Sequence, residues 1–352
     1  MRLLSWLLAS GLLSATGTLA QVTVPSSFTV GAKFQIVIHN TIDPDSPLEP
    51  ADALVWDIDL FHLARTPEVA NHIRSTNPSA TILCYFNAGL AQTSDCDYPR
   101  WDSSGLLGNP YDITDPDLFP DERWINIKNA TAREWIKWRI SLARDLGCDG
   151  VDPDNIDGFL NDYDGDNGTG WSLSEDDYVA FVTELAEHAH GLTTLQGNTM
   201  LIGQKNAPEL IGRVKDVLDF AVLEDCRTIN DEEDYEFCTD FKEAYIDEGK
   251  PVFSIEYPST IGENGECWAT GASEDEYNVA CEEGAAGFST VLKIQGEGEL
   301  NGCTQYCDGG EPGTGVVVTP TDPERDGDPC PNDAIRGESL GGQGTGRWRW
   351  RK

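Results

Sequence analysis

The chain has 352 residues, of which 61 are acidic and 24 are basic, giving a formal net charge of −37 at pH 7. A hydrophobic content of 39% is enough for a core and excludes a disordered protein, and the length allows one large domain or two. This charge argues against binding to nucleic acid or to an anionic membrane. It is explained either by solubility in an acidic medium or by attraction of a cationic partner.

The N-terminus has the pattern of a secretory signal peptide. Arg2 is followed by an apolar run and then by small residues that end at Ala20, and the run is too short to span a membrane. We therefore expect residues 1–20 to be removed and the protein to be secreted, extracellular or associated with a cell wall. N-glycosylation sequons at Asn129 and Asn167 agree with export.

Ten cysteines in a secreted chain indicate disulfide bonds. The short spacings make Cys226–Cys238 and Cys267–Cys281 the expected pairs, each closing one loop. Spacing leaves the other pairings open. A metal site is disfavoured because no CxxC pair accompanies these cysteines.

Eight apolar runs of strand type alternate with segments long enough for crossover helices. The runs cover residues 34–39, 53–60, 81–89, 147–158, 200–206, 220–226, 251–257 and 289–295. This alternation predicts parallel strands in a (β/α)8 TIM barrel over residues 21–300, with disulfide-stapled loops. A doubly wound open sheet is the alternative, but no Gly-rich phosphate turn follows the first strand. We expect residues 301–352 to be an irregular, largely disordered tail.

The fourth run is unusually acidic, with Asp149, Asp152, Asp154 and Asp157 among glycines. The period of a strand puts Asp152 and Asp154 on one face. Taken alone, such a stretch is a solvated acidic turn or a calcium loop.

Polar side chains end most of the other predicted strands as well. They are Asp57, Asp59, Tyr85, Asn87, Asp152, Asp154, Lys205, Asn206, Glu224, Glu256 and Tyr257. Because active sites of TIM barrels lie at the carboxyl ends of the strands, these residues predict a functional site there.

Converging carboxylates without a nucleophile triad favour glycoside hydrolysis, in which one carboxylic acid protonates the departing oxygen and a second carboxylate attacks or activates water. A divalent metal held by Asp152, Asp154 and Asp157 is the chemical rival. It is less favoured because one loop would supply most of the ligands, so we expect no metal and no cofactor.

These residues also carry a resemblance. Taken together, the segments 57–59, 84–89, 147–158, 205–206, 224–226 and 255–257 resemble glycoside hydrolase family 114, the endo-α-1,4-polygalactosaminidases. The resemblance covers about residues 30–295 and implies a secreted (β/α)8 enzyme that cuts chains of α-1,4-linked galactosamine. It also implies that Asp154 and Glu224 are the catalytic carboxylates. The family often has Asn before that Glu, where this chain has Leu223, which puts a supporting hydrogen bond in doubt.

The implied substrate is a polycation, which gives the acidic charge a use. Candidates for contacts with its amines are Asp57, Asp59, Asp152, Asp157 and Glu256; the alternative for each is to orient Asp154, Glu224 or Lys205. Tyr85, Trp124 and Tyr257 are candidates for stacking on sugars, with core packing as the alternative. The remaining candidates for substrate binding are Asn87, Asn155, Lys205 and Asn206.

We hypothesise that Asp154 is the nucleophile and Glu224 the general acid/base of a retaining hydrolase. We expect a monomer with no nucleic-acid or membrane partner. The alternatives are a non-catalytic carbohydrate-binding or cell-wall protein and a glycosidase that acts on another amino-sugar polymer.

Overall fold

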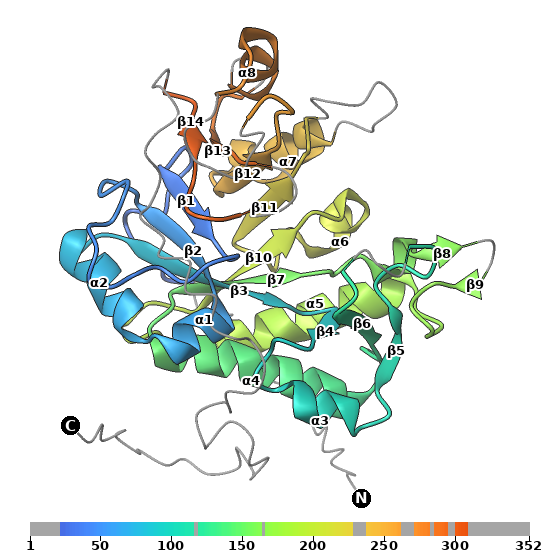
Figure 1. Cartoon of the computed structure of the whole chain (residues 1–352). Coiled ribbons are helices and arrows are strands. Elements are labelled where there is room, and N and C mark those ends of the chain that lie inside the picture. Colours follow the sequence, from blue (N-terminus) through green and yellow to red (C-terminus); the bar gives the residue numbers. More distant parts are fainter. Residues whose placement is uncertain are drawn as a thin grey trace, which may run out of the picture.

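The computed structural model describes residues 22–115, 119–163, 166–227, 237–261, 271–281, 285–294 and 300–308. Its centre is a curled nine-stranded sheet whose first eight strands are parallel and follow the order of the chain (Figure 1). They are β1 (Phe34–Val37), β2 (Val55–Asp59), β3 (Thr81–Asn87), β7 (Gly150–Asp154), β10 (Leu201–Lys205), β11 (Phe220–Glu224), β12 (Val252–Glu256) and β13 (Phe288–Leu292). This is a TIM-barrel-like fold, so the predicted fold is confirmed.

Helices cover the outer face of the sheet. They are α1 (Leu60–Arg65), α2 (Glu68–Thr76), α4 (Ala130–Leu146), α5 (Glu175–His190), η2 (Pro208–Leu210), α6 (Ile211–Val214), α7 (Cys238–Ala244), η3 (Ile246–Glu248) and α8 (Glu274–Cys281). The two longest, α4 and α5, lie side by side (Figure 1). Local signals set their bounds: the side chain of Asn129 caps α4, left-handed Gly147 ends it, and Ser174 and Asp177 form a capping box on α5. Residues 38–54, between β1 and β2, contain no helix.

The alternation of side chains along each strand separates two cores. In β2, Val55 packs inside the barrel with Phe34, whereas Trp56 and Ile58 pack against the outer helices. Asp57 therefore shares the inner face with Val55. Every second residue of a strand faces the barrel interior, and the last of these residues reach its carboxyl end.

An insertion between β3 and α4 builds a wall beside the barrel (Figure 1). It contains β4 (Leu90–Gln92), α3 (Tyr98–Asp102), β5 (Leu107–Pro110) and β6 (Glu122–Ile125), and the strands pair in the antiparallel order β4-β6-β5. Arg139 of α4, which is fully buried, anchors it through two hydrogen bonds to Asp97, at 2.6 and 3.1 Å, and one to the backbone oxygen of Asn87, at 2.8 Å. A buried charge is tolerated when it is paired in this way.

After β7 the chain makes a short helix and a hairpin. These are η1 (Gly158–Leu160), β8 (Asp162–Tyr163) and β9 (Asp166–Asn167). They follow the acidic stretch directly and lie next to the inserted sheet (Figure 1).

The seam between β1 and β13 is closed by the segment that follows β13. The Nζ atom of buried Lys293 donates hydrogen bonds to the backbone oxygen of Ile36, at 2.8 Å, and to the hydroxyl of Thr304, at 2.7 Å. The backbone oxygen of Leu300 accepts hydrogen bonds from the two residues after β1, and β14 (Gln305–Tyr306) pairs antiparallel with β13. Residues 301–308 of the expected tail therefore belong to the barrel, while residues 309–352 lie outside the described part.

Three disulfides join described cysteines: Cys84–Cys148, Cys226–Cys238 and Cys281–Cys307. The predicted pair of Cys226 and Cys238 is confirmed. The predicted pair of Cys281 with Cys267 is wrong, because the return of the chain after β13 brings Cys307 to α8. The expected signal peptide lies outside the described residues, and no helix among those described is long and apolar enough to cross a membrane.

Candidate active site

A cleft of about 750 Å³ opens at the carboxyl ends of the barrel strands and is bounded on one side by the inserted sheet. Many of the candidates predicted from the sequence line it: Asp59, Tyr85, Trp124, Asp154, Asn155, Asp157, Lys205, Asn206 and Glu224. This is the face on which TIM barrels carry their active sites. Residues far apart in the chain meet here because parallel strands all end at this edge.

Lys205, the last residue of β10, lies between two carboxylates. Its Nζ atom is 3.2 Å from Oδ1 of Asp154 and 2.9 Å from Oε2 of Glu224. Burial favours the neutral amine, but the charges of Asp154 and Glu224 outweigh it and raise the pKa of Lys205 well above its usual value. Lys205 is therefore an ammonium group that links the two acids.

Asp154, at the end of β7, is oriented by three donors. The hydroxyl of Tyr85 donates to Oδ2 at 2.7 Å, while the backbone N–H of Asn155 donates to Oδ1 at 2.8 Å, beside Lys205. Burial, followed by the charge of Asp154, raises the pKa of Tyr85 well above its usual value, so the phenol keeps its proton. Donors of this kind stabilise an ionised carboxylate.

Glu224, at the end of β11, is held from two sides. The hydroxyl of Tyr257 donates to Oε1 at 2.6 Å, and the side-chain oxygen of Asn206 accepts the backbone N–H of Glu224 at 2.9 Å. Leu223, which stands where the family often has Asn, packs in the outer core. Tyr257 and Lys205 thus hold this carboxylate, and Asn206 holds the backbone of Glu224, without a polar residue at position 223.

Asp57 and Asp152 lie behind the cleft and are fully buried. If both were ionised, all four carboxyl oxygens would lack a hydrogen-bond donor. Burial, then the charge of Asp152, raises the pKa of Asp57 well above its usual value, so Asp57 keeps a proton and donates it in a hydrogen bond to Asp152. Burial raises the pKa of Asp152 to about 7, against the opposing charge of Lys205. Neither residue lines the cleft. This position is compatible with a role in orienting Asp154, Glu224 or Lys205, the alternative to direct contact with the substrate.

Three further candidates do not line the cleft either. Buried Asn87 accepts the backbone N–H of Leu90 at 2.8 Å and so fixes the turn into β4. Tyr257 is buried behind Glu224. Glu256 precedes Tyr257 on β12, and the alternation that directs Tyr257 into the barrel directs Glu256 outward.

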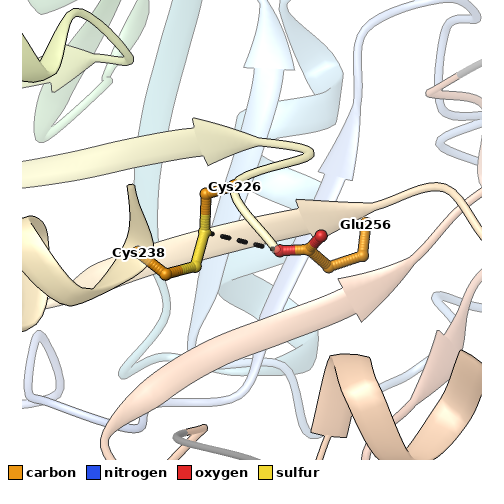
Figure 2. A group of neighbouring side chains, drawn as sticks. All are labelled: Cys226, Cys238 and Glu256. Carbon is orange, nitrogen blue, oxygen red and sulfur yellow. Dashed lines mark hydrogen bonds between the residues drawn. A yellow bond between two sulfur atoms is a disulfide. The ribbon is translucent and has the colours of Figure 1, made fainter. Parts of the chain in front are cut away.

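Glu256 instead lies against the disulfide of Cys226 and Cys238, with Oε1 3.5 Å from the sulfur of Cys226 (Figure 2). Among the described residues, these three could bring their ligand atoms to a metal. Zinc requires thiolates, however, and sulfurs in a disulfide are not thiolates. Burial raises the pKa of Glu256 to about 7, although the hydrogen bond from Ser254 opposes the shift.

The sequence interpretation missed the contribution of the inserted sheet, where Gln92, Tyr111 and Glu122 line the cleft together with Trp124. Burial, followed by the charge of Asp154, raises the pKa of Glu122 to about 8. Glu122 precedes Trp124 by two residues, so the period of a strand relates the two. This period would reveal Glu122 from the sequence only if residues 122–125 were recognised as a strand.

Comparison with known proteins identifies the family of the chain. No curated protein sequence matches the chain, but the model of glycoside-hydrolase family GH114 matches residues 15–311. The crystal structure of Aspergillus fumigatus Ega3 in complex with galactosamine is 33% identical, covers 82% of this chain and 100% of its own, and superposes with a TM-score of 0.63. The glycoside hydrolase domain of PelA from Pseudomonas aeruginosa shares the fold at 12% identity, covering 78% of this chain and 98% of its own with a TM-score of 0.51. The chain belongs to glycoside-hydrolase family GH114 and is a glycoside hydrolase.

Proposed function

We propose that the protein is a secreted, endo-acting hydrolase of α-1,4-linked galactosamine polymers. The observation that carries this proposal is the pair Asp154 and Glu224, joined by Lys205 in the cleft. The similarity to Ega3, whose structure contains galactosamine, supports the choice of sugar. The three disulfides support secretion, because disulfides persist in oxidising compartments.

In the proposed mechanism, Asp154 attacks the anomeric carbon while Glu224, in the enzyme molecules in which it carries a proton, transfers that proton to the departing glycosidic oxygen. Tyr85, the backbone N–H of Asn155 and Lys205 all donate to the carboxyl oxygens of Asp154, an arrangement that suits a carboxylate nucleophile. Glu224 then accepts a proton from the water that releases the sugar from Asp154. The ammonium of Lys205 stabilises the charge as it moves between the two acids.

The spacing of the acids supports retention of configuration. One oxygen of Asp154 and one of Glu224 each lie about 3 Å from the same nitrogen, so these oxygens are at most about 6 Å apart. Retaining enzymes have carboxyl groups about 5–5.5 Å apart, whereas inverting enzymes need about 6.5–9.5 Å to admit a water molecule.

The charge of the cleft supports a cationic substrate. Asp59 and Asp157 line it in addition to the two proposed catalytic acids, and the whole chain carries a formal net charge of −37. Negative walls around a cleft concentrate a polycation and raise its rate of association.

Release of reducing ends from deacetylated α-1,4-galactosamine polymer tests the proposal. We expect Asp154→Asn and Glu224→Gln each to lower kcat by at least about 100-fold, because each removes one partner of the acid/base reaction. Asp121→Asn, which removes an exposed acid outside the cleft lining, is the control and should keep full activity. Nuclear magnetic resonance of the first product should show the α-anomer.

Other outcomes discriminate among the alternatives. Full activity of either catalytic variant would contradict the assigned roles. Retention on the polymer without product would identify a binding protein, and product from a different amino-sugar polymer alone would change the substrate.

A further inference from the structure

The inserted sheet presents a carboxyl group and an aromatic ring on one face of β6. Glu122 and Trp124 are two residues apart, so both side chains point to the same side of the strand, and both line the cleft. Gln92 lies opposite Glu122 in the paired strand β4, and its amide donates a hydrogen bond to Oε1 of Glu122. The carboxyl group is thus oriented by its neighbour while only 9% of the residue is exposed.

The surroundings of Glu122 are acidic. The charges that act on it are those of Asp154 from β7, Asp95 from the segment after β4 and adjacent Asp121, and all three disfavour its ionised form. Glu122 forms no ion pair with any described residue, whereas Asp154 and Glu224 share Lys205 and Asp95 pairs with Arg139. Glu122 therefore has room in its surroundings for a cation that is not part of the described chain, such as a charged group of a ligand.

We propose that Glu122 recognises the protonated amine of the galactosamine unit bound at Asp154. This inference rests on the proposed function and deepens it by assigning the residue that selects a free amine. An ammonium group between Glu122 and Asp154 would offset the repulsion between them and provide the missing cation. Trp124, on the same face of β6, is 2% exposed and stacks on Tyr111, so it packs the sheet beside Glu122.

Recognition by Glu122 is coupled to the loss of a proton. Burial and the nearby acids raise the pKa of Glu122 to about 8 in the free protein, so its carboxyl is neutral in weakly acidic solution. A bound ammonium stabilises the ionised form and lowers that pKa, and the proton goes to the solvent. An N-acetylated sugar carries no charge at this position, so it leaves the proton on Glu122 and binds without this ion pair.

Isothermal titration calorimetry with D-galactosamine and short galactosamine oligomers tests the coupling. At about pH 6 the sugar amine is charged, and measurements in two buffers of different ionisation enthalpy give the protons released. We expect the wild-type protein to release about one proton per site, and Glu122→Gln to release none and to bind at least 10-fold more weakly. Asp216→Asn, the loss of an exposed acid that neither lines the cleft nor acts on Glu122, should behave like the wild type.

Hydrolysis supplies the second measurement. We expect Glu122→Gln to lower kcat/KM at least 10-fold for fully deacetylated oligomers and to change it little for cleavage at acetylated units. Asp157→Asn removes another acid of the cleft. Loss of proton release or of amine preference in Asp157→Asn instead of Glu122→Gln would overturn the assignment, as would unchanged proton release in Glu122→Gln.

A further variant guards against a failure of Glu122→Gln to fold. Gln92→Leu removes the hydrogen bond that opposes the raised pKa of Glu122, so galactosamine should bind more weakly and still release a proton. Unchanged affinity would count against the proposal. Failure of the proposed function looks different: the wild type would bind galactosamine with proton release yet produce no reducing ends. Absence of galactosamine binding by the wild type would overturn both proposals.

Discussion

Lys205 interacts with two sets of carboxyl groups. It forms ion pairs with Asp154 and Glu224 in the cleft, and the hydrogen-bonded pair of Asp57 and Asp152 lies behind it. The two buried acids differ in their protonation. Asp57 carries the proton of the pair, whereas Asp152, once it ionises above about pH 7, supplies part of the negative charge that keeps Lys205 an ammonium. Replacing Asp57 by Asn and replacing Asp152 by Asn should therefore affect the activity differently.

We expect Asp57→Asn to be tolerated, because an amide resembles a protonated carboxyl group and still donates to Asp152. Asp152→Asn should lower kcat at least about 10-fold, since it leaves buried Lys205 with less compensating charge. The rate against pH should discriminate the two: the acidic limb of kcat/KM should shift for Asp152→Asn and stay in place for Asp57→Asn. Equal effects of the two substitutions would contradict a proton held on Asp57.

Single residues also show what the sequence could predict of the site. The strand-end rule correctly indicated Tyr85, Lys205 and Glu224 as residues of the cleft, but Asp57, Asn87, Asp152 and Tyr257, on the inner faces of their strands, do not line it. Glu256 ends its strand too, but lies on the outer face, and the sequence interpretation did not apply the alternation there. Glu122 was missed because it belongs to the insertion and not to a barrel strand.

Among the elements, the turn from β3 into β4 and the loop after β7 are packed backbone to backbone. A Cβ atom on Gly89 would lie 1.9 Å from the backbone oxygen of Asn155. Asn155 itself has a φ of 56°, in the left-handed region that Asn tolerates better than most residues. The position of Asn155, and with it the donor to Asp154, depends on the absence of a side chain at residue 89.

We expect Gly89→Ala to lower activity at least about 10-fold and the free energy of unfolding by about 1–3 kcal/mol, because the backbone must move to admit the methyl group. Gly212→Ala is the control, since a Cβ atom there meets nothing within 4 Å and lies in helix α6. It should be neutral or stabilise the protein by up to about 1 kcal/mol. Urea unfolding and initial rates measure both effects, and similar behaviour of the two variants would refute the close approach.

The barrel strands could be predicted from sequence because parallel strands that are buried on both faces read as continuous apolar runs. The inserted sheet could not be predicted in this way, because its strands come from segments that are far apart in the chain. Leu90 of β4, for example, pairs with Trp124 of β6. The same limit applies to the disulfides. Cys226 and Cys238 are close in sequence, whereas Cys84 and Cys148 meet only because β3 and β7 are neighbours in the sheet.

For the whole molecule, three buried acids have pKa values above those of an unfolded chain: about 7 for Asp152 and Glu256, and about 8 for Glu122. Between about pH 4.5 and pH 8 the folded chain therefore holds protons that the unfolded chain has released. Under this condition stability falls as the pH rises. Glu276 acts in the opposite direction, since its pKa of about 2 provides stability that is lost only as the pH falls toward 2.

We therefore expect the protein to be most stable in mildly acidic solution, with a Tm at pH 5 that exceeds the Tm at pH 8 by at least about 4 °C. Differential scanning calorimetry over this range is the measurement. Glu256→Gln, which cannot ionise, should flatten the dependence. A Tm that rises steadily from pH 5 to pH 8 would show that the buried acids are ionised in the folded state.

The seam between β1 and β13 has a consequence for the order in which the molecule can form. Residues 300–308 hold the two edges together, and Leu300 also lines the cleft. A ribosome produces the chain from its N-terminus, so every barrel strand is made before the segment that joins the last one to the first. The growing chain can pair neighbouring strands as they appear, but the finished cleft must wait for almost the last described residue.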